Sequence, residues 1–334
     1  MIKLTSVHIL KNRRNLLAFS AGVDSSALFF LLLDAGVKFD IAIVNYGVRE
    51  QSKEEVSYAK ELASKYNLEC FVLDAEVIEK NFEAKAREIR YEFFESIIKQ
   101  NSYDNLLTAH HLGDRFEWML MQFCKGAGCV ELAGMQKVQK RGFYTLVRPL
   151  LHLDKSELYP YLQENKIKFF EDKTNDDTNI KRNEFRHNHT KPLLKKYLNG
   201  IKKSFEYIDA DREAFVIEVD VVQIGELTYF DNTSNKRANI YNIDKVLKSN
   251  YKYMLSANEK KLLQEQYTLV VGRKFVVSQN LEYIFIAPYI TKTQEDAMDW
   301  EFKELCRALE IEPKLRPYLY ENPDVFSRIS KLLI

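Results

Sequence analysis

The stretch from Ser20 to Ser26 combines small residues, three hydroxyls and one carboxylate in a way that suits the binding of phosphate. It follows residues 15–19, an apolar segment typical of a buried strand, and it precedes an apolar helix expected over 24–35. Backbone N–H groups converge where such a helix begins, and the helix dipole adds partial positive charge there. Gly22 can adopt a positive φ in this turn. The sequence therefore predicts a nucleotide held by its phosphates, without a lysine in the turn.

We expect the nucleotide to contact this turn and one asparagine at the same edge of the sheet: Ser20, Ala21, Gly22, Val23, Asp24, Ser25, Ser26 and Asn45. The turn differs from P-loop and dinucleotide-binding loops, because neither GxxxxGK[ST] nor GxGxxG occurs in it. Taken alone, the same residues also fit an ordinary strand-to-helix turn in which Asp24 or Ser25 caps the helix. Their place at the first crossover of an α/β pattern favours the phosphate interpretation.

A second polar group lies between residues 108 and 118, where two histidines precede Asp114 and Glu117. The two carboxylates are three residues apart, so they share one face of the first turn of a helix. They can simply complement the helix dipole, or they can hold magnesium or the ammonium group of a substrate. The spacing alone leaves both interpretations open.

Short apolar runs alternate with longer amphipathic segments through the first part of the chain. We expect strands over 15–19, 39–45, 69–74 and 104–109, and helices over 24–35, 52–66, 83–100 and 112–124. This order predicts a doubly wound α/β fold with a mostly parallel sheet, in which ligands bind beyond the carboxyl ends of the strands. Both polar groups fall at that edge. After residue 215, strand-like runs mix with helices, which predicts a smaller α+β domain.

The expected domains are a catalytic domain over residues 1–196, a helical linker over 197–214 and a C-terminal α+β domain over 215–334, which we expect to bind tRNA. With 334 residues, of which 46% are hydrophobic, the chain can fill two cores. Its 49 basic and 48 acidic side chains give a net charge of +1, so any preference for a polyanion must come from local clusters. No run of about 20 apolar residues and no secretory leader occurs, which makes a cytoplasmic location the expectation.

Motifs in order along roughly residues 15–196 resemble those of the tRNA(Ile)-lysidine synthases, a family of N-type ATP pyrophosphatases. The turn resembles their SGGxDS loop, with Ala21 in place of the first glycine. Residues 108–118 resemble their HHxDDQxET pattern, in which Gly113, Arg115 and Trp118 stand for Asp, Gln and Thr. The other similar stretches are Val44–Arg49 with Tyr46 in place of a histidine, Glu83–Tyr91, Arg148–Leu151, and Asp172–Asn175 followed by Arg182–Arg186.

The resemblance implies an enzyme that activates the wobble cytidine of an isoleucine tRNA with a CAU anticodon. The C2 oxygen of that base would attack the α-phosphate of ATP and expel pyrophosphate, and L-lysine would then displace AMP to form lysidine. By the same resemblance Asp24 would hold Mg²⁺, and Arg87 or Arg90 would neutralise the α-phosphate. Asp114 and Glu117 would receive the ammonium group of lysine and lower its proton load.

Basic residues near the end of the catalytic domain are the expected contacts to tRNA phosphates, with a solvated helix face as the alternative: Arg182, Arg186, Lys195 and Lys196. Two other functions stay open, a tRNA thiolase of the same superfamily and a non-catalytic ATP-binding regulatory module. The thiolase needs cysteines spaced for sulfur transfer or for a cluster, and the four cysteines include no CxxC. We expect these cysteines to be reduced and mostly buried. The oligomeric state is left open, a homodimer being one option.

Overall fold

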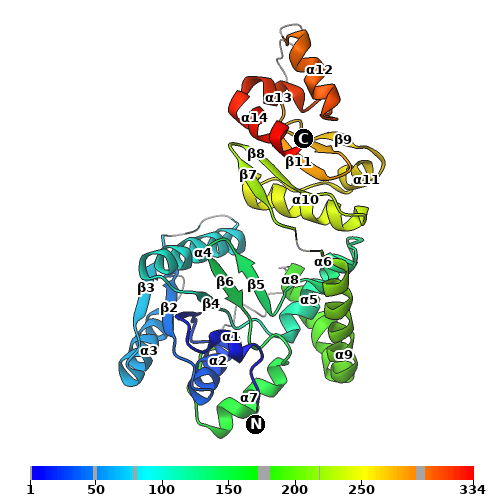
Figure 1. Ribbon diagram of the computed structural model, residues 1–334. Helices are drawn as coiled ribbons and strands as arrows, with labels where there is room; N and C mark the ends of the chain where they lie inside the picture. Colours follow the sequence, from blue (N-terminus) through cyan, green and yellow to red (C-terminus); the bar gives the residue numbers. More distant parts are fainter. Residues whose placement is uncertain are drawn as a thin grey trace. The chain divides into compact units, whose positions relative to one another are not determined.

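The computed structural model describes residues 2–47, 51–76, 78, 81–171, 181–217, 219–290 and 298–334. The chain divides into two compact units, Met1–Arg212 and Glu213–Ile334 (Figure 1). This division falls later than residue 196, because helix α9 (Lys191–Phe215) continues through that position. The backbone of α9 departs from helical dihedral angles at Tyr197, so residues 197–214 belong to the second part of one long kinked helix.

The first unit is built on a six-stranded sheet with the order β3-β2-β1-β4-β6-β5. All neighbours are parallel except β5 and β6, which form an antiparallel pair. The strands are β1 (Asn15–Ala18), β2 (Asp40–Asn45), β3 (Cys70–Asp74), β4 (Asn105–Leu107), β5 (Val138–Arg141) and β6 (Tyr144–Val147). The prediction of a doubly wound, mostly parallel α/β fold is confirmed.

The helices of this unit connect the strands and continue after them. They are α1 (Val7–Leu10), α2 (Val23–Asp34), α3 (Gln51–Tyr66), α4 (Phe82–Asn101), α5 (Leu112–Phe123), α6 (Cys129–Ala133), α7 (Lys155–Glu164) and α8 (Lys181–Phe185). A π-helical turn, Arg186–Thr190, joins α8 to α9. Each strand and helix expected over residues 15–124 is present, with ends that differ by at most two residues.

Side chains of the parallel strands alternate between two cores, as a period of two residues requires. Leu17 and Ile41 pack with α2, α3 and α7 on one face of the sheet. Leu16 and Ala42 pack with α4 on the other face. A separate apolar cluster joins α5 to α9. Covered on both faces, the sheet presents the carboxyl ends of β1, β2, β4 and β6 at one edge, where the polar loops lie.

The second unit contains a five-stranded antiparallel sheet with the order β7-β8-β11-β10-β9. The strands are β7 (Val222–Ile224), β8 (Leu227–Asp231), β9 (Thr268–Val271), β10 (Phe275–Gln279) and β11 (Tyr283–Pro288). One core includes α10 (Lys236–Tyr251) and α11 (Ala257–Glu265), and the other includes α12 (Trp300–Ala308), α13 (Arg316–Glu321) and α14 (Pro323–Leu332). The expected α+β character of this region is confirmed.

Two general expectations concern features outside the site. The expectation of mostly buried cysteines is wrong, because Cys124 and Cys129 are exposed and Cys70 is half-buried, which leaves Cys306 as the buried one. The helices within the described ranges were too short or too polar for any of them to cross a bilayer.

Candidate active site

The turn between β1 and α2 leaves the start of the helix without a side-chain cap. Gly22 is the N-cap residue of α2, and it has no side chain with which to cap the first-turn N–H groups. The backbone N–H of Ser20 donates to Ser25 Oγ at 3.2 Å, and the hydroxyl oxygens of these serines lie 3.0 Å apart, so they brace the turn from within. The N–H of Phe170 donates to the carbonyl of Ala21 at 2.9 Å, and Phe170 forms a parallel bridge with Gly22. A distant stretch of chain thus fixes the turn.

Ala21 occupies a position at which the resembling family has glycine. Its φ is +56° and its side chain is fully buried. A left-handed backbone costs a residue with a Cβ about 1 kcal/mol relative to glycine. The turn therefore keeps the conformation that glycine would allow and carries a small strain.

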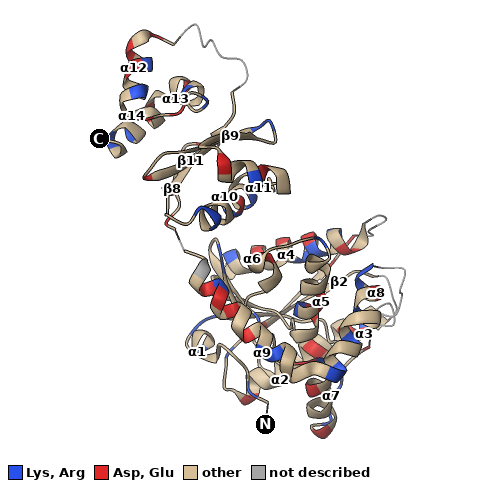
Figure 2. Cartoon of the chain, turned by 90° about the vertical axis from the view of Figure 1, so that its right-hand side faces the viewer, with Lys and Arg blue, Asp and Glu red and all other residues tan. Residues whose placement is uncertain are grey.

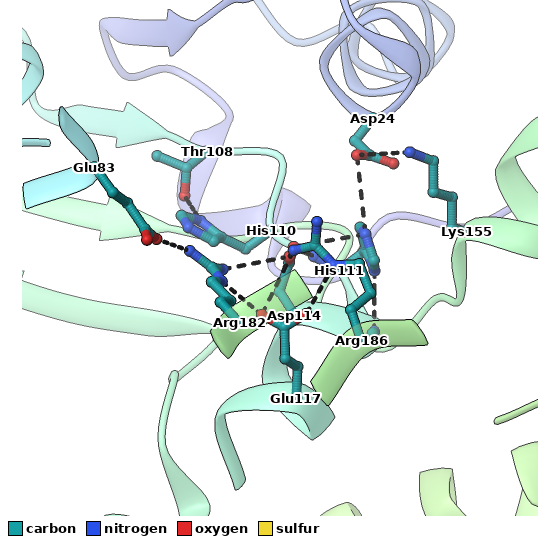
Figure 3. Close-up of polar contacts among 11 residues, drawn as sticks. Asp24, Glu83, Thr108, His110, His111, Asp114, Glu117, Lys155, Arg182 and Arg186 are labelled. Carbon is teal, nitrogen blue, oxygen red and sulfur yellow. Dashed lines mark hydrogen bonds and ion pairs between the residues drawn. The ribbon is translucent and has the colours of Figure 1, made fainter. Parts of the chain in front are cut away.

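We call residues 20–26 the phosphate turn. Asp24, in the first turn of α2, brings this turn close to the ammonium group of Lys155 and the ring of His111 (Figure 3). Its Oδ2 lies 3.7 Å from Lys155 Nζ and 3.8 Å from His111 Nε2. Its Oδ1 is buried and has no hydrogen-bond partner within the described part of the chain. An uncompensated buried carboxylate oxygen is costly, so this atom is suited to a ligand or a cation.

One ring nitrogen of His111 caps α5, and the other faces the carboxylates of Asp24 and Asp114. Its Nδ1 accepts from the N–H of Gly113 at 2.9 Å, so the ring proton is on Nε2. That nitrogen lies 3.6 Å from Asp114 Oδ2 and faces Asp24 on its other side. Asp114 completes the capping box by accepting from the N–H of His111. A Cβ on Gly113 would lie 2.6 Å from the His111 ring, which explains why glycine stands here.

Glu117 is almost fully buried and is held by two arginines from the end of the unit. Arg182 Nε donates to Glu117 Oε1 at 2.5 Å, and Arg186 Nε donates to Oε2 at 2.7 Å. Both guanidinium groups also lie within 3.8 Å of Asp114 Oδ1. The arginines are four residues apart, across the junction of α8 with the π-helical turn, so they reach the same side. We call Asp114, Glu117, Arg182 and Arg186 the carboxylate–arginine cluster, which Figure 3 shows.

Burial and charge shift the pKa values of this cluster in opposite senses. Burial by itself raises the pKa of Asp114, but His111, His110 and the two arginines outweigh it and hold the pKa well below its usual range. Burial lowers the pKa of Arg182, whereas its hydrogen bonds to Glu117 and Glu83 raise it, and the net pKa is raised. The pKa of the buried His110 is lowered to about 4, chiefly by desolvation. Near pH 7 Asp114 and Arg182 are therefore ionised and His110 is neutral.

The other residues predicted for the site take different positions. Arg87 lies over the ring of Tyr91 at 4.8 Å. Arg90 donates to the carbonyl of Ala86 at 3.3 Å and interacts with the hydroxyl of Tyr46. Asn45, at the end of β2, donates to Asp74 and accepts from the N–H of Gly47, so its amide shapes this edge.

The residues predicted to bind RNA fall into two groups. The side chains of Arg182 and Arg186 point into the carboxylate cluster. Lys195 and Lys196 are exposed on α9, whose basic residues lie mostly in its first half and its acidic residues in its second half (Figure 2). The predicted motif residues Val48, Arg49 and Asp172–Asn175 lie outside the described residues.

Two residues gain a role that their sequence positions did not suggest. Lys155, at the start of α7, supplies an ammonium group beside Asp24 that the phosphate turn itself lacks. Arg115 is 2% exposed, donates to the carbonyl of Ala133 and pairs with Asp209 on α9. It also lies 4.3 Å from the centre of the Phe205 ring. Arg115 therefore braces α5 against α9 and does not face the site.

Comparison with known proteins gives a consistent result. Residues 2–193 match the PP-loop domain family. A tRNA(Ile)-lysidine synthase from Helicobacter pylori is 40% identical, and the match covers 95% of this chain and 92% of that protein. The enzyme of the same name from Wolinella succinogenes is also 40% identical, with 96% and 97% covered.

The chain belongs to the tRNA(Ile)-lysidine synthase family.

A further relative of this name, from Campylobacter jejuni, is 38% identical over 98% of this chain and 99% of that protein. The U34-tRNA thiolase NcsA from Methanococcus maripaludis has a similar solved structure, with a TM-score of 0.51 and 17% sequence identity. That match covers 64% of this chain and 76% of the thiolase, and at this identity it shows a shared fold alone. The family resemblance inferred from the motifs is confirmed, and the thiolase alternative has less support.

Proposed function

We propose that this protein uses ATP to ligate L-lysine to C2 of the wobble cytidine in an isoleucine tRNA with a CAU anticodon, releasing AMP and pyrophosphate in the cytoplasm. The observation that carries the proposal is the position of His111, whose Nε2 lies 3.8 Å from Asp24 and 3.6 Å from Asp114. One side chain thus connects the turn suited to a triphosphate with the cluster suited to an amino acid. Activation by ATP followed by transfer to an amine requires these two parts to adjoin.

The phosphate turn serves the first step, in which the C2 oxygen of cytidine attacks the α-phosphorus and the bond to pyrophosphate breaks. The first-turn N–H groups of α2 bind the triphosphate, and Lys155 adds positive charge beside it. Arg87 or Arg90, both on α4, would neutralise the α-phosphate. The unpartnered Oδ1 of Asp24 fits a hard cation such as Mg²⁺. When bound, that ion would spread the charge of the leaving group.

The carboxylate–arginine cluster serves the second step, in which the lysine amine bonds to C2 and AMP leaves. Two guanidinium groups and two carboxylates are complementary to an amino acid, since the arginines match its carboxylate and Asp114 and Glu117 match an ammonium group. A carboxylate with a strongly lowered pKa holds an ammonium group well and accepts a proton poorly. Asp114 therefore anchors the lysine and is not the base.

Two groups of basic residues contribute to holding the RNA in this proposal. Lys195 and Lys196 are exposed and contribute phosphate contacts that do not depend on sequence. Arg182 and Arg186 sit at the boundary between the lysine site and the RNA, because each side chain is still about a quarter to a third exposed.

Nucleoside analysis tests the proposal directly. The full-length protein is incubated with an unmodified CAU-anticodon transcript, ATP, Mg²⁺ and isotope-labelled lysine, and the wobble nucleoside is then analysed by mass. We expect one labelled lysine per tRNA, with AMP and pyrophosphate formed in equal amounts. A transcript with uridine at the wobble position is the control and should gain no lysine. Sulfide-dependent turnover would support a thiolase, and ATP binding without pyrophosphate release would support a regulatory module.

A further inference from the structure

A group of three arginines surrounds one tyrosine on the α4 side of the sheet. The Cζ atoms of Arg87 and Arg141 lie 4.8 Å and 5.2 Å from the centre of the Tyr91 ring. Arg148, directly after β6, is 4% exposed, and its charge interacts with both arginines and with Tyr91. We call these four residues the Tyr91 cluster. They come from α4, the end of β5 and the end of β6, so the fold brings together charges that are distant in sequence.

The Tyr91 cluster holds polar atoms that the described chain leaves without partners. Tyr91 Oη, Arg141 Nε and Arg148 Nε are all buried and make no hydrogen bond there. Arg148 is otherwise held in place, since its Nη1 donates to the carbonyl of Gln136 at 2.8 Å. Glu95, one turn further along α4, accepts from the hydroxyl of Tyr144 and forms no ion pair with Arg141. Three guanidinium groups are thus gathered without a carboxylate partner among the described residues.

Such an arrangement is unfavourable until an anion fills it. Burial, with the charges of Arg141 and Arg87 added to it, lowers the pKa of Arg148 to about 10. Buried donors without acceptors carry a further desolvation penalty. A phosphate group would balance the positive charge because it is anionic. Its oxygens would also accept several hydrogen bonds from the guanidinium groups.

The position of the cluster separates it from the triphosphate. The phosphate turn follows β1, whereas β6 and β5 are two and three strands away, which is about 10 to 14 Å at the usual strand spacing. Asn45, the expected nucleotide contact on β2, lies on the opposite side of β1. The cluster still adjoins the site, because Arg87 and Arg148 both act on the charge of His110.

We propose that the Tyr91 cluster binds a backbone phosphate of the substrate RNA close to the nucleotide under reaction. This proposal rests on the proposed function, in which an RNA base must reach the phosphate turn. Arg90 then serves the α-phosphate of ATP, and Arg87, one turn earlier on the same helix, serves the RNA.

Arg141→Gln tests the assignment, with Arg14→Gln as the matched control. Arg14 also lies over a tyrosine, at 5.0 Å from the Tyr103 ring, but it directly precedes β1, which is three strands away from β5 in the sheet. Binding of the full-length protein to the CAU-anticodon transcript is measured over a series of salt concentrations, without ATP or lysine. We expect Arg141→Gln to bind about tenfold more weakly, with the slope of log K against log salt reduced by about one. Arg14→Gln should match the wild type.

Tyr91→Phe provides a milder second variant, because it keeps the ring and removes only the unpartnered hydroxyl. We expect RNA binding about threefold weaker, with an unchanged salt slope. The Michaelis constants for ATP and lysine should stay within about twofold of wild type in both variants. An unchanged salt slope in Arg141→Gln overturns the proposal, and so does a rise in the Michaelis constant for ATP or lysine, which would assign the cluster to that substrate.

The two proposals can fail separately. If the wild type forms lysidine and Arg141→Gln binds RNA like the wild type, the phosphate site is wrong and the proposed function stands. If the wild type forms no lysidine and Arg141→Gln still loses RNA affinity and salt dependence, the phosphate site stands and the proposed function is wrong.

Discussion

The phosphate turn and the carboxylate–arginine cluster differ in how far their polar groups are already satisfied. In the turn, α2 begins at Gly22 without a capping side chain, and Asp24 Oδ1 has no partner in the described chain. In the cluster, each oxygen of Glu117 is bonded to an arginine. His111 lies between these two parts. The first part is arranged for a ligand, whereas the second part is neutralised by its own charges.

Under the proposed function, the two substrates would therefore bind at different cost. ATP would meet donors that are already free, so little would have to rearrange. Lysine would have to replace ion pairs that exist before it arrives, so part of its binding free energy would be offset by the pairs that it breaks. Until then, the carboxylates and guanidinium groups of the cluster balance one another's charge.

Asp24→Asn tests the phosphate turn, and of these variants it should change activity the most. We expect the rate of tRNA-dependent pyrophosphate release to fall about 10³-fold, about 4 kcal/mol of transition-state free energy. The free energy of unfolding should change by less than about 0.5 kcal/mol, because the contacts of Asp24 with Lys155 and His111 are long and partly exposed. Asp34→Asn, at the far end of α2 where Asp34 accepts from Tyr161, is the control and should keep the wild-type rate. Equal losses in both variants would contradict the role of Asp24.

Glu117→Gln tests the carboxylate–arginine cluster, where both the stability of the protein and its activity should fall. The change removes the carboxylate that makes the shortest contact with each guanidinium group, and since both groups are partly exposed we expect a loss of about 2 to 3 kcal/mol in the free energy of unfolding. Chemical denaturation of the full-length protein measures this. Glu83→Gln removes a partner of the same Arg182, but Glu83 is 61% exposed, so the loss there should be below about 0.5 kcal/mol. A variant Glu117→Gln as stable as wild type would show that the pairs contribute nothing.

A change of pH tests the neutral histidine beside the cluster. The pKa of His110 is about 4 in the folded protein and about 6.5 in an unfolded chain. The unfolded state therefore binds more protons between these values, and stability is full above pH 6.5 and falls as the pH drops towards 4. This residue alone should lower the free energy of unfolding by about 2 kcal/mol between pH 7 and pH 5. His110→Asn, which keeps a donor near Thr108, should remove that part of the pH dependence.

Ala21→Gly tests the backbone strain in the phosphate turn, and of these variants it should change stability and activity the least. Glycine relieves the strain of a φ of +56°, but it also loses a buried methyl group and gains backbone entropy in the unfolded chain. We expect the free energy of unfolding to change by no more than about 0.5 kcal/mol, and the Michaelis constant for ATP to stay within about twofold. Loss of nucleotide binding in this variant would show that the alanine methyl group takes part in the site.

Local patterns in the sequence predicted the frame of the first unit well. The strands and helices up to residue 124 depend on alternating apolar runs, and their observed ends agree within two residues. The turn at residues 20–26 could be located because its residues are contiguous, and its binding of phosphate stays a prediction. The carboxylates Asp114 and Glu117 could be placed together because they share one helical turn.

The partners of those residues could not be predicted, because they come from distant segments. Arg182 meets Glu117 across 65 positions, and nothing local distinguishes it from an arginine on a solvated helix. Lys155 reaches Asp24 from the start of α7, where it appears as an ordinary surface residue in the sequence. The pairing of Gly113 with the His111 cap depends on ring position, which a pattern of residue types does not specify.

The hydrogen bond from Phe170 to Ala21 sets a lower limit on the length of chain that the proposed nucleotide site needs. During synthesis the ribosome produces the turn early, yet its last brace emerges about 150 residues later. Nascent chains that end before residue 170 should therefore not bind ATP. ATP binding would begin only once the first unit is nearly complete.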